Sequence, residues 1–126
     1  MKQFKLNINT KTQKYPIIIG RGLLNNLPKL LKNNSLYFTK YLIVIDNKIK
    51  KKLISRILKK FDKKNIITFL FNANEKNKNQ KNVDKILALL LKNNFQRNDC
   101  LISVGGGITG DVSGFASSIY KRGINF

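Results

Sequence analysis

Apolar and polar positions repeat along this chain with two different periods. Three short, predominantly apolar runs cover residues 41–45, 66–71 and 101–104. Continuous apolar runs of this length are typical of strands that are buried on both faces. We therefore expect three strands of one sheet in the second part of the chain.

Between and after these runs, apolar residues recur every three or four positions, which is the spacing of an amphipathic helix. Strands that alternate with helices favour right-handed crossovers and a parallel sheet covered on both faces. The expected fold class is α/β, with a Rossmann-like parallel sheet and flanking helices. The stripes that we expect to face inward are Ile49, Leu53, Ile54, Ile57, Leu58 and Phe61; Val83, Ile86, Leu87, Leu90 and Leu91; and Ile108, Val112, Phe115, Ile119 and Tyr120.

A shorter alternation opens the chain. Phe4, Leu6 and Ile8 alternate with polar residues, and a second apolar segment follows at residues 15–19. This pattern predicts an antiparallel β-hairpin before the sheet. A leucine-rich helix is expected next, with Pro28 as a distortion or break within it.

The junction after the third strand carries the most chemical information. Gly105, Gly106 and Gly107 separate that strand from the last helix, so the backbone can approach a ligand where a Cβ would block it. The free N–H groups and the dipole of a helix N-terminus favour a bound pyrophosphate. Gly110 keeps the next turn thin, and Asp111 is suited to accept hydrogen bonds from a ribose hydroxyl or a carboxamide. A flexible start to an ordinary helix is the alternative interpretation.

Ligands of parallel α/β sheets collect at the carboxyl ends of the strands. Three loops begin there in this chain, at Asp46, Asn72 and Gly105. We therefore expect these loops to lie near one another. The stretch over residues 72–82 is rich in Asn and Lys, which by itself is typical of a solvated loop.

The chain is strongly basic, with 25 Lys and Arg against 6 Asp and Glu and a formal net charge of +19. Such an excess normally points to a nucleic-acid partner. Nearly all of the positive charge is Lys, however, and Lys, Asn and Ile are abundant together, as biased AT-rich codons would make them. We therefore interpret the lysines as a solvated surface and do not expect nucleic-acid binding.

Length, cysteine use and hydropathy limit the class of protein further. The 126 residues allow one domain with a real core. Cys100 is the only cysteine, so no disulfide can form within the chain, and a reducing compartment fits. No apolar stretch approaches the ~18 residues of a membrane span, and we expect a cytoplasmic protein with no membrane partner.

The glycine junction and the residues after it resemble a known family. The segment GGGITGDVSGFASSIYKRGINF resembles the GGGxxGDxxGFxAxxxxRGxxF signature of 3-dehydroquinate synthase, a sugar-phosphate cyclase. The segment YPIIIGRGLL is similar to the opening hairpin of that family, and residues 74–78 resemble its GExYK loop. The resemblance covers the whole chain but only the amino-terminal part of the family's length. It implies that residues 1–126 form an NAD-binding amino-terminal domain.

The resemblance also implies roles for individual residues. Asp46 would bind the adenosine ribose, where the alternative is a helix N-cap. Arg122 would bind the substrate, where the alternative is a surface ion pair. Asn74 and Asn77 replace the Gly and Tyr of the family's loop, and Asn tolerates left-handed backbone angles at the first of these positions. The positions that match the family's NAD contacts are Asp46, Glu75, Lys78, Gly106, Gly107, Gly110 and Asp111.

Part of the family's chemistry cannot come from these residues. The family binds a divalent metal, zinc or cobalt, through one Glu and two His, and this sequence contains no His. The metal and most of the substrate site are therefore expected from residues after Phe126, in a carboxy-terminal half or a partner chain. We expect the chain alone to contain no catalytic residue and to be inactive.

For the complete enzyme, the resemblance implies a homodimer that converts 3-deoxy-D-arabino-heptulosonate 7-phosphate to 3-dehydroquinate and phosphate in the shikimate pathway, which leads to aromatic amino acids. Another sugar-phosphate cyclase or a glycerol-dehydrogenase-like enzyme is an alternative, because the glycine turn and Asp111 are shared more widely. The RGxxF ending and the GExxK-like loop favour the synthase. A basic nucleic-acid-binding domain is the alternative that is not an enzyme.

Overall fold

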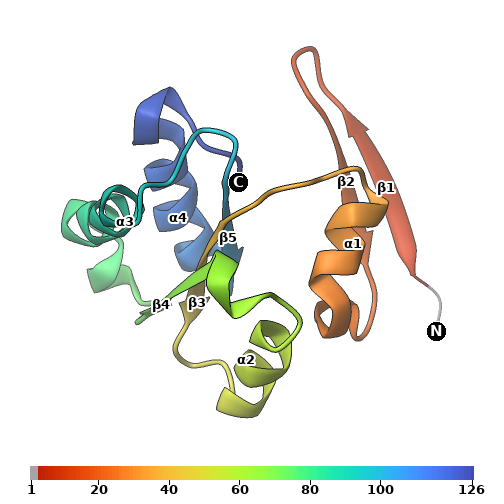
Figure 1. The fold of residues 1–126 in the computed structure, drawn as a ribbon, viewed down its shortest axis with the longest axis horizontal. Helices are drawn as coiled ribbons and strands as arrows, with labels where there is room; N and C mark the ends of the chain where they lie inside the picture. Colours follow the sequence, from red (N-terminus) through yellow and green to blue (C-terminus); the bar gives the residue numbers. More distant parts are fainter. Residues whose placement is uncertain (1–2) are drawn as a thin grey trace.

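The computed structural model describes residues 3–126, and Figure 1 shows how they are arranged. In this part of the chain, an antiparallel pair β1-β2 accompanies a parallel three-stranded sheet in the order β4-β3-β5. No helix of the described residues has the length and the apolar character needed to span a membrane. The elements are β1 (Phe4–Asn9), β2 (Lys14–Ile19), η1 (Leu23–Asn26), α1 (Leu27–Asn33), β3 (Tyr41–Asp46), α2 (Lys51–Leu58), η2 (Lys63–Asn65), β4 (Ile66–Phe71), η3 (Glu75–Asn77), α3 (Gln80–Lys92), β5 (Cys100–Val104), α4 (Gly107–Ile119) and η4 (Tyr120–Arg122).

The predicted parallel sheet is confirmed. Tyr41 of β3 lies opposite Ile66 of β4 on one side and opposite Cys100 of β5 on the other. β3 is therefore the central strand, and residues 42–45 have no exposed surface. The continuous apolar run follows from this position, because a central strand that is covered on both faces has no side for polar residues.

Helices cover both faces of the parallel sheet. Leu42 and Val44 of β3 belong to one apolar core, which also contains residues of α3 and α4. The alternate residues of β3 belong to a second core, which contains Ile57 of α2 and is lined by η1 and α1. Successive strand residues point to opposite faces, so one strand serves both cores. In Figure 1, α3 and α4 lie on one side of the sheet, and α1 with the hairpin lies on the other.

The predicted hairpin is also confirmed, with Phe4 of β1 opposite Ile19 of β2. The leucine-rich helix that follows is divided into η1 and α1. Pro28 lies in the first turn of α1. A residue without an N–H loses no hydrogen bond there, so the proline begins the second helix and does not interrupt it.

Two residues predicted to face inward on α4 are exposed. Phe115 and Ile119 are 51% and 46% exposed, whereas Ser113 and Ala116 of the same helix have no exposed surface. The distance between packed elements depends on the side chains at their contact. α4 therefore approaches the sheet with its small residues and turns Phe115 outward.

The other predicted stripes need smaller corrections. Leu91 at the end of α3 is 61% exposed, and Leu53 of α2 is also exposed. α2 is shorter than its apolar pattern, since it ends at Leu58, yet Phe61 beyond its end is buried. The chain therefore buries the last apolar residue of this pattern from a turn and not from the helix.

The thiol of Cys100 provides a test of the packing of β5. Burial raises the pKa of Cys100 to about 12, and the nearby charge of Asp99 acts in the same direction. Because the thiolate is the reactive form, we expect no reaction of the native chain with Ellman's reagent near neutral pH. The denatured chain should react fully. Rapid labelling without denaturant would contradict the burial of this strand.

Gly105 provides a second test, because the strand ends there without room for a side chain. A Cβ at Gly105 would lie 2.7 Å from Thr109 Oγ1 and 3.0 Å from Asp46 Cβ. We expect Gly105→Ala to lower the free energy of unfolding by about 1–3 kcal/mol, the usual cost of overpacking. Urea denaturation would measure it. Gly110→Ala is the matched control, since a Cβ there would meet no atom within 4 Å. An equal loss in both variants would refute the close contact.

Candidate functional site

The loops after β3 and β4 are tied together at the carboxyl edge of the sheet. The backbone N–H of Asn47 donates to Phe71 O at 2.9 Å. The ammonium of Lys48 donates to Ala73 O at 2.6 Å. Two hydrogen bonds thus fix the start of one loop against the start of the other, as predicted from the parallel order of the strands.

Asp46 is the last residue of β3 and lies between these loops and the third one. Its Oδ1 accepts a hydrogen bond from the backbone N–H of Lys48 at 3.0 Å. α2 begins only at Lys51, so the interpretation of Asp46 as a helix N-cap is wrong. The position that a Cβ of Gly105 would occupy is 3.0 Å from Asp46 Cβ. The three predicted loops therefore lie together, and Asp46 Oδ2 remains available for an external donor.

α4 starts with an open space that we call the glycine cradle, formed by Gly106, Gly107 and Gly110. A Cβ added at any of these residues would meet no atom within 4 Å. Gly106 is the N-cap, no side chain caps the helix, and the first turn contains no acidic residue. The unsatisfied N–H groups of a first helical turn attract an anion, and the helix dipole adds to this attraction. The cradle can therefore accept a phosphate group.

Two buried hydroxyls belong to the first two turns of α4, the helix that begins at the cradle. Thr109 and Ser113 have no exposed surface, and their hydroxyl oxygens have no hydrogen-bond partner among the described residues. An unsatisfied buried polar group costs about 1–3 kcal/mol. Thr109 belongs to the first turn of α4 and packs directly against Gly105. An unpartnered hydroxyl beside an open cradle fits a site that receives a polar ligand or an ordered water.

Lys78 and Asp111 form the one ion pair of the described residues, with Nζ and Oδ2 2.8 Å apart. The hydrogen bond to Asp111, and then the charge of that residue, raises the pKa of Lys78. Asp111 lies on α4 one position after Gly110, so its negative charge would otherwise act on any anion in the cradle. The pair neutralises that charge.

A depression of about 250 Å³ lies beside this ion pair. Its rim is polar, and its floor contains apolar side chains of α3 and α4. An apolar surface next to an anion site suits a ligand that joins a flat ring to a phosphate. The residues that line it are Lys78, Asn79, Gln80, Val83, Asp111, Val112 and Phe115.

The asparagines of residues 72–82 hold the loop in place. Asn74 Oδ1 accepts from the N–H of Asn77 at 3.0 Å, and Asn77 Nδ2 donates to Asn72 O at 2.8 Å. Asn79 Oδ1 accepts from the N–H of Asn82 at 3.1 Å. Asn74 has an extended backbone, with φ −151°, so the tolerance of Asn for left-handed angles is not used here. A stretch that composition describes as a solvated loop is internally bonded.

These asparagines fix the conformation of the loop, and the sequence analysis did not identify them. Asn74 and Asn79 each cap a helical turn by accepting a hydrogen bond from the N–H three residues ahead. That spacing is the ordinary signature of an N-cap and could have been found in the sequence. Glu75 lies exposed in η3, between the two caps. Its loop is therefore fixed, whereas its carboxylate is free to reach a ligand.

Arg122 lies at the opposite end of α4 from the glycine cradle. The 13 residues of α4 separate the two by about 20 Å, at 1.5 Å per residue. Arg122 forms no ion pair with any described residue, so a surface ion pair does not account for it. It lines a shallow depression of about 460 Å³ together with Arg97. The structure thus brings Asp46, the cradle and the Lys78–Asp111 pair together, but not Arg122.

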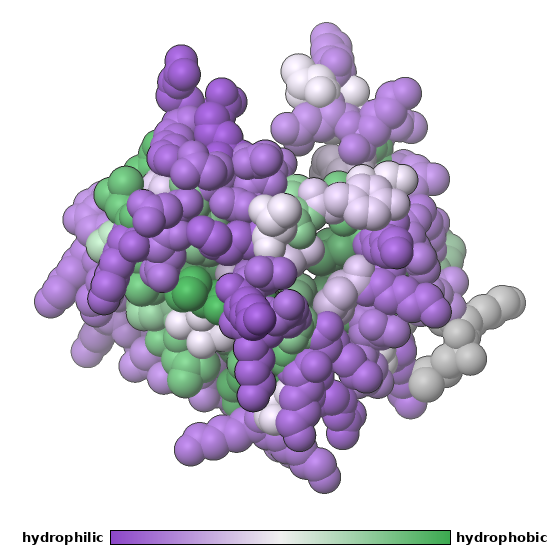
Figure 2. Space-filling view, viewed as in Figure 1, coloured by the Kyte–Doolittle hydropathy of each residue, from purple (hydrophilic) through white to green (hydrophobic). Residues whose placement is uncertain are grey.

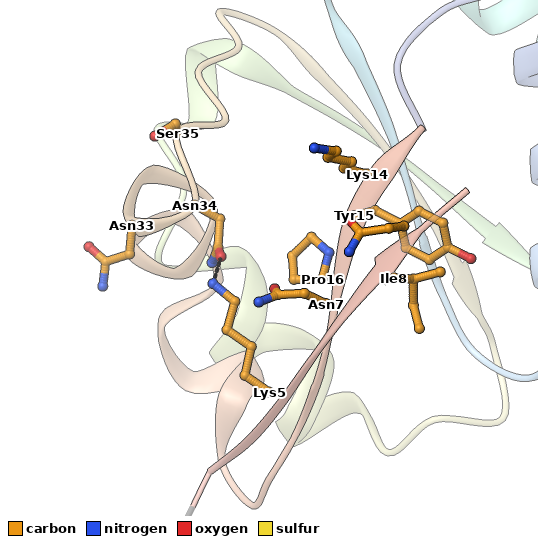
Figure 3. Close-up of a pocket in the computed structure, with 10 residues that line it drawn as sticks. Lys5, Asn7, Ile8, Lys14, Tyr15, Pro16, Asn33, Asn34 and Ser35 are labelled. Carbon is orange, nitrogen blue, oxygen red and sulfur yellow. Dashed lines mark hydrogen bonds between the residues drawn. The ribbon is translucent and has the colours of Figure 1, made fainter. Parts of the chain in front are cut away.

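Another depression, of about 520 Å³, lies between the hairpin and α1 (Figure 3). Lys5 Nζ donates to Asn34 Oδ1 across it at 2.8 Å. None of the predicted site residues lines it, so it is separate from the candidate site. Its lining residues are Lys5, Asn7, Ile8, Asn9, Lys14, Tyr15, Pro16, Asn33, Asn34 and Ser35.

The lysines predicted to form a solvated surface are exposed on α2 and on the turn after it. Lys51, Lys52, Lys59 and Lys60 all lie in solvent. In Figure 2, hydrophilic residues cover most of the visible face, and hydrophobic patches show between them. Exposure supports the interpretation as a solvated surface, while the absence of nucleic-acid binding stays a prediction.

A metal site does not fit the described residues. Residues 3–126 contain no group of three or more His, Cys, Asp or Glu side chains that could hold a metal ion. Zinc or cobalt would therefore need ligands from outside this part of the chain.

The sequence of this chain is similar to those of known proteins. The family model described as "3-dehydroquinate synthase N-terminal" matches residues 68–126. The 3-dehydroquinate synthase of Pelagibacter ubique is 53% identical over all 126 residues, which cover 34% of that protein. That of Blochmanniella floridana is 36% identical over 97% of this chain and 34% of its own length. The chain therefore spans about a third of the length of the curated relatives it matches.

Solved structures resemble the fold at lower identity. A 2-deoxy-scyllo-inosose synthase, complexed with carbaglucose-6-phosphate, NAD+ and Co2+, gives a TM-score of 0.80 at 20% identity, over 96% of this chain and 33% of that one. The 2-epi-5-epi-valiolone synthase of Streptomyces hygroscopicus, with NAD+ and Zn2+ bound, gives 0.71 at 22% identity, over 93% and 32%. These matches establish the fold. Together with the relative that is 53% identical from end to end, they lead to one conclusion: the chain belongs to the 3-dehydroquinate synthase family, whose amino-terminal part it matches.

Proposed function

We propose that this chain binds NAD in the glycine cradle and serves as the dinucleotide-binding part of a 3-dehydroquinate synthase. The observation that carries the proposal is the open space at Gly106, Gly107 and Gly110, at a helix N-terminus that no side chain caps. A pyrophosphate has the charge and the size to use the free N–H groups there. For the full-length enzyme we propose the conversion of 3-deoxy-D-arabino-heptulosonate 7-phosphate to 3-dehydroquinate and phosphate.

Asp46 is proposed to hold the adenosine ribose. Its Oδ1 is already oriented by the N–H of Lys48, so the carboxylate is held in place before the ligand arrives. A carboxylate at the end of such a strand can accept the hydrogens of the ribose hydroxyls. A Cβ built at Gly105 would lie 3.0 Å from Asp46 Cβ, so a ribose held by Asp46 would lie next to the glycine turn.

Glu75, Lys78 and Asp111 are proposed to line the nicotinamide side. An isolated Asp111 would repel the pyrophosphate, and the 2.8 Å pair with Lys78 removes this obstacle. Asp111 and Glu75 can then accept hydrogen bonds from a ribose hydroxyl or from the carboxamide. The apolar floor of the adjacent depression, which includes Val112, offers a surface for the ring.

Bound NAD supplies reversible hydride transfer in the proposed reaction. The residues of this chain contribute binding and orientation, which fix the position of the reacting ring against the substrate. The described residues contain no group of side chains that could hold a metal ion. The ligands of the zinc or cobalt in the proposed enzyme would therefore come from other residues. Proton transfer at the substrate is likewise assigned outside this chain.

Arg122 is proposed to bind an anionic group of the sugar phosphate. Its guanidinium is always charged and offers a planar fork of donors for phosphate or carboxylate. The length of α4 keeps it away from the cradle of its own chain. In a homodimer, Arg122 of one subunit could bind the substrate next to the NAD that is held by the cradle of the other subunit. This arrangement would allow Arg122 to bind the substrate although it lies far from the cradle of its own chain.

Gly107→Ala tests the cradle directly. Gly107 is the first residue of α4, and a methyl group added there would meet no protein atom, so the substitution introduces no clash in the protein. We expect an unchanged or higher melting temperature together with an NAD affinity at least about tenfold weaker, a loss of about 1.4 kcal/mol. Isothermal titration calorimetry measures the affinity. Gly114→Ala on the same helix is the control and should leave the NAD affinity unchanged. A Cβ there would lie 3.2 Å from Phe126 Cε1, so the melting temperature of this control is measured as well. Full NAD affinity in Gly107→Ala would contradict the proposed cradle.

Two proteins test whether this chain supplies NAD binding while the metal site comes from other residues. The 126-residue chain alone should release no phosphate from the heptulosonate phosphate, because its sequence has no His for the metal site. A chimera of this chain with the remaining part of the Pelagibacter ubique relative should release phosphate when NAD and a divalent metal are present. A chimera that binds NAD but leaves this substrate unchanged would favour another sugar-phosphate cyclase. Turnover by the chain alone would refute the division.

A further inference from the structure

The turn that carries Arg122 has an unusual backbone. Lys121, Arg122 and Gly123 have φ values of 47°, 65° and 116°, all in the left-handed region. Only glycine adopts such angles without cost. Lys121 and Arg122 are exposed, so burial of their own side chains does not impose the conformation. Something else must hold the turn, and strained turns of this kind cluster at functional sites.

The residue before the turn provides the restraint. Tyr120 is buried, and its hydroxyl lies 2.9 Å from Phe95 O and 3.2 Å from Leu90 O. Both carbonyls belong to the end of α3 and the turn that follows it, so the hydroxyl fastens the end of α4 to a neighbouring element. Burial, and then the charge of Asp99, raises the pKa of Tyr120. The phenol therefore remains a hydrogen-bond donor near neutral pH.

Backbone hydrogen bonds close the turn on its other side. The N–H of Gly123 donates to Tyr120 O at 2.8 Å, and the N–H of Ile124 donates to Ser117 O at 2.9 Å. Asn125 Nδ2 donates to Asp99 O at 3.0 Å. The turn is thus anchored on both sides, and Arg122 projects from it without an ion pair to any described residue.

We propose that Tyr120 is a positioning residue, whose hydroxyl on the Phe95 carbonyl holds the left-handed turn that presents Arg122 to the anionic group of the substrate. The proposal rests on the function proposed above for Arg122. Tyr120 itself is buried in the apolar core, so we assign it no direct contact with cofactor or substrate. Its hydroxyl acts through the backbone of the turn, whereas its ring acts through packing.

Tyr120→Phe separates these two contributions, because it removes the hydroxyl and keeps the ring. In the chimera, we expect the KM for the sugar phosphate to rise about 5- to 20-fold, with kcat within about twofold and the KM for NAD unchanged. Gly123→Ala, which opposes a φ of 116° where a Cβ meets no atom, should give the same pattern. Ser117→Ala is the matched control, since it removes a buried hydroxyl that bonds within its own helix.

Two further measurements separate the possible failures. In a double-mutant cycle, Tyr120→Phe should not raise the KM for the sugar phosphate any further once Arg122→Ala is present. Fully additive effects on this KM would overturn the positioning role of Tyr120 and leave the assignment of Arg122 intact. If Arg122→Ala leaves the KM for the sugar phosphate unchanged, the assignment of Arg122 fails and the positioning role fails with it. In the 126-residue chain, Tyr120→Phe should accelerate hydrogen exchange at the N–H groups of Gly123 and Ile124, and Ser117→Ala should not. Unchanged exchange in Tyr120→Phe would also overturn the proposal.

Discussion

The lack of space at Gly105 governs the arrangement of this site. The end of β5 passes between Thr109 and Asp46, where a Cβ would come within 3.0 Å of both side chains. Only a glycine lets the chain turn there from strand to helix while staying next to the end of β3. Because the turn is so tight, the first residues of α4 lie beside Asp46, and the glycine cradle opens at that point. The other features of the site take their positions from this contact.

A second consequence of the same contact is that α4 must lie close to the sheet along its length. Ser113 and Ala116 meet this requirement, because small side chains occupy little space between helix and strand. This arrangement explains where the sequence prediction succeeded and where it failed. The strand over Ile66–Phe71 was predicted to the residue, since a short apolar run leaves a local signal. The expectation that this strand is buried on both faces was wrong, because β4 is an edge strand and Leu70 is 58% exposed. Phe115 was placed on the wrong side, because α4 is apolar around much of its circumference and the choice of face depends on closeness to the sheet.

The candidate site also has features that could be predicted from the sequence and features that could not. The positions of Asp46 and the glycines in the fold could be predicted from the end of a strand and the start of a helix, which are local features. The bonded asparagines could not be recognised from composition, since the same residues in a solvated loop would give the same count. The N-cap spacing of Asn74 and Asn79 was the one signal in the sequence that could have shown them. Asn74 shows the difference: it was expected to matter for its backbone angles, and it acts through its side chain. The separation of Arg122 from the cradle was implicit in the helix length, which fixes a distance as soon as both ends are known.

Charge plays a limited part in holding this fold. Among the described residues, Asp62 and Asp99 bond to backbone N–H groups, and Asp84 bonds to the side chain of Gln80. Only Asp111 pairs with a cation, so the two apolar cores, and not ion pairs, connect the elements. The net charge of +19 is therefore left largely uncompensated. Such a charge raises the local concentration of every anion without distinguishing one from another. For the proposed NAD site, discrimination between a dinucleotide and other anions would therefore come from the shape of the cradle, and so from the absence of side chains at its glycines.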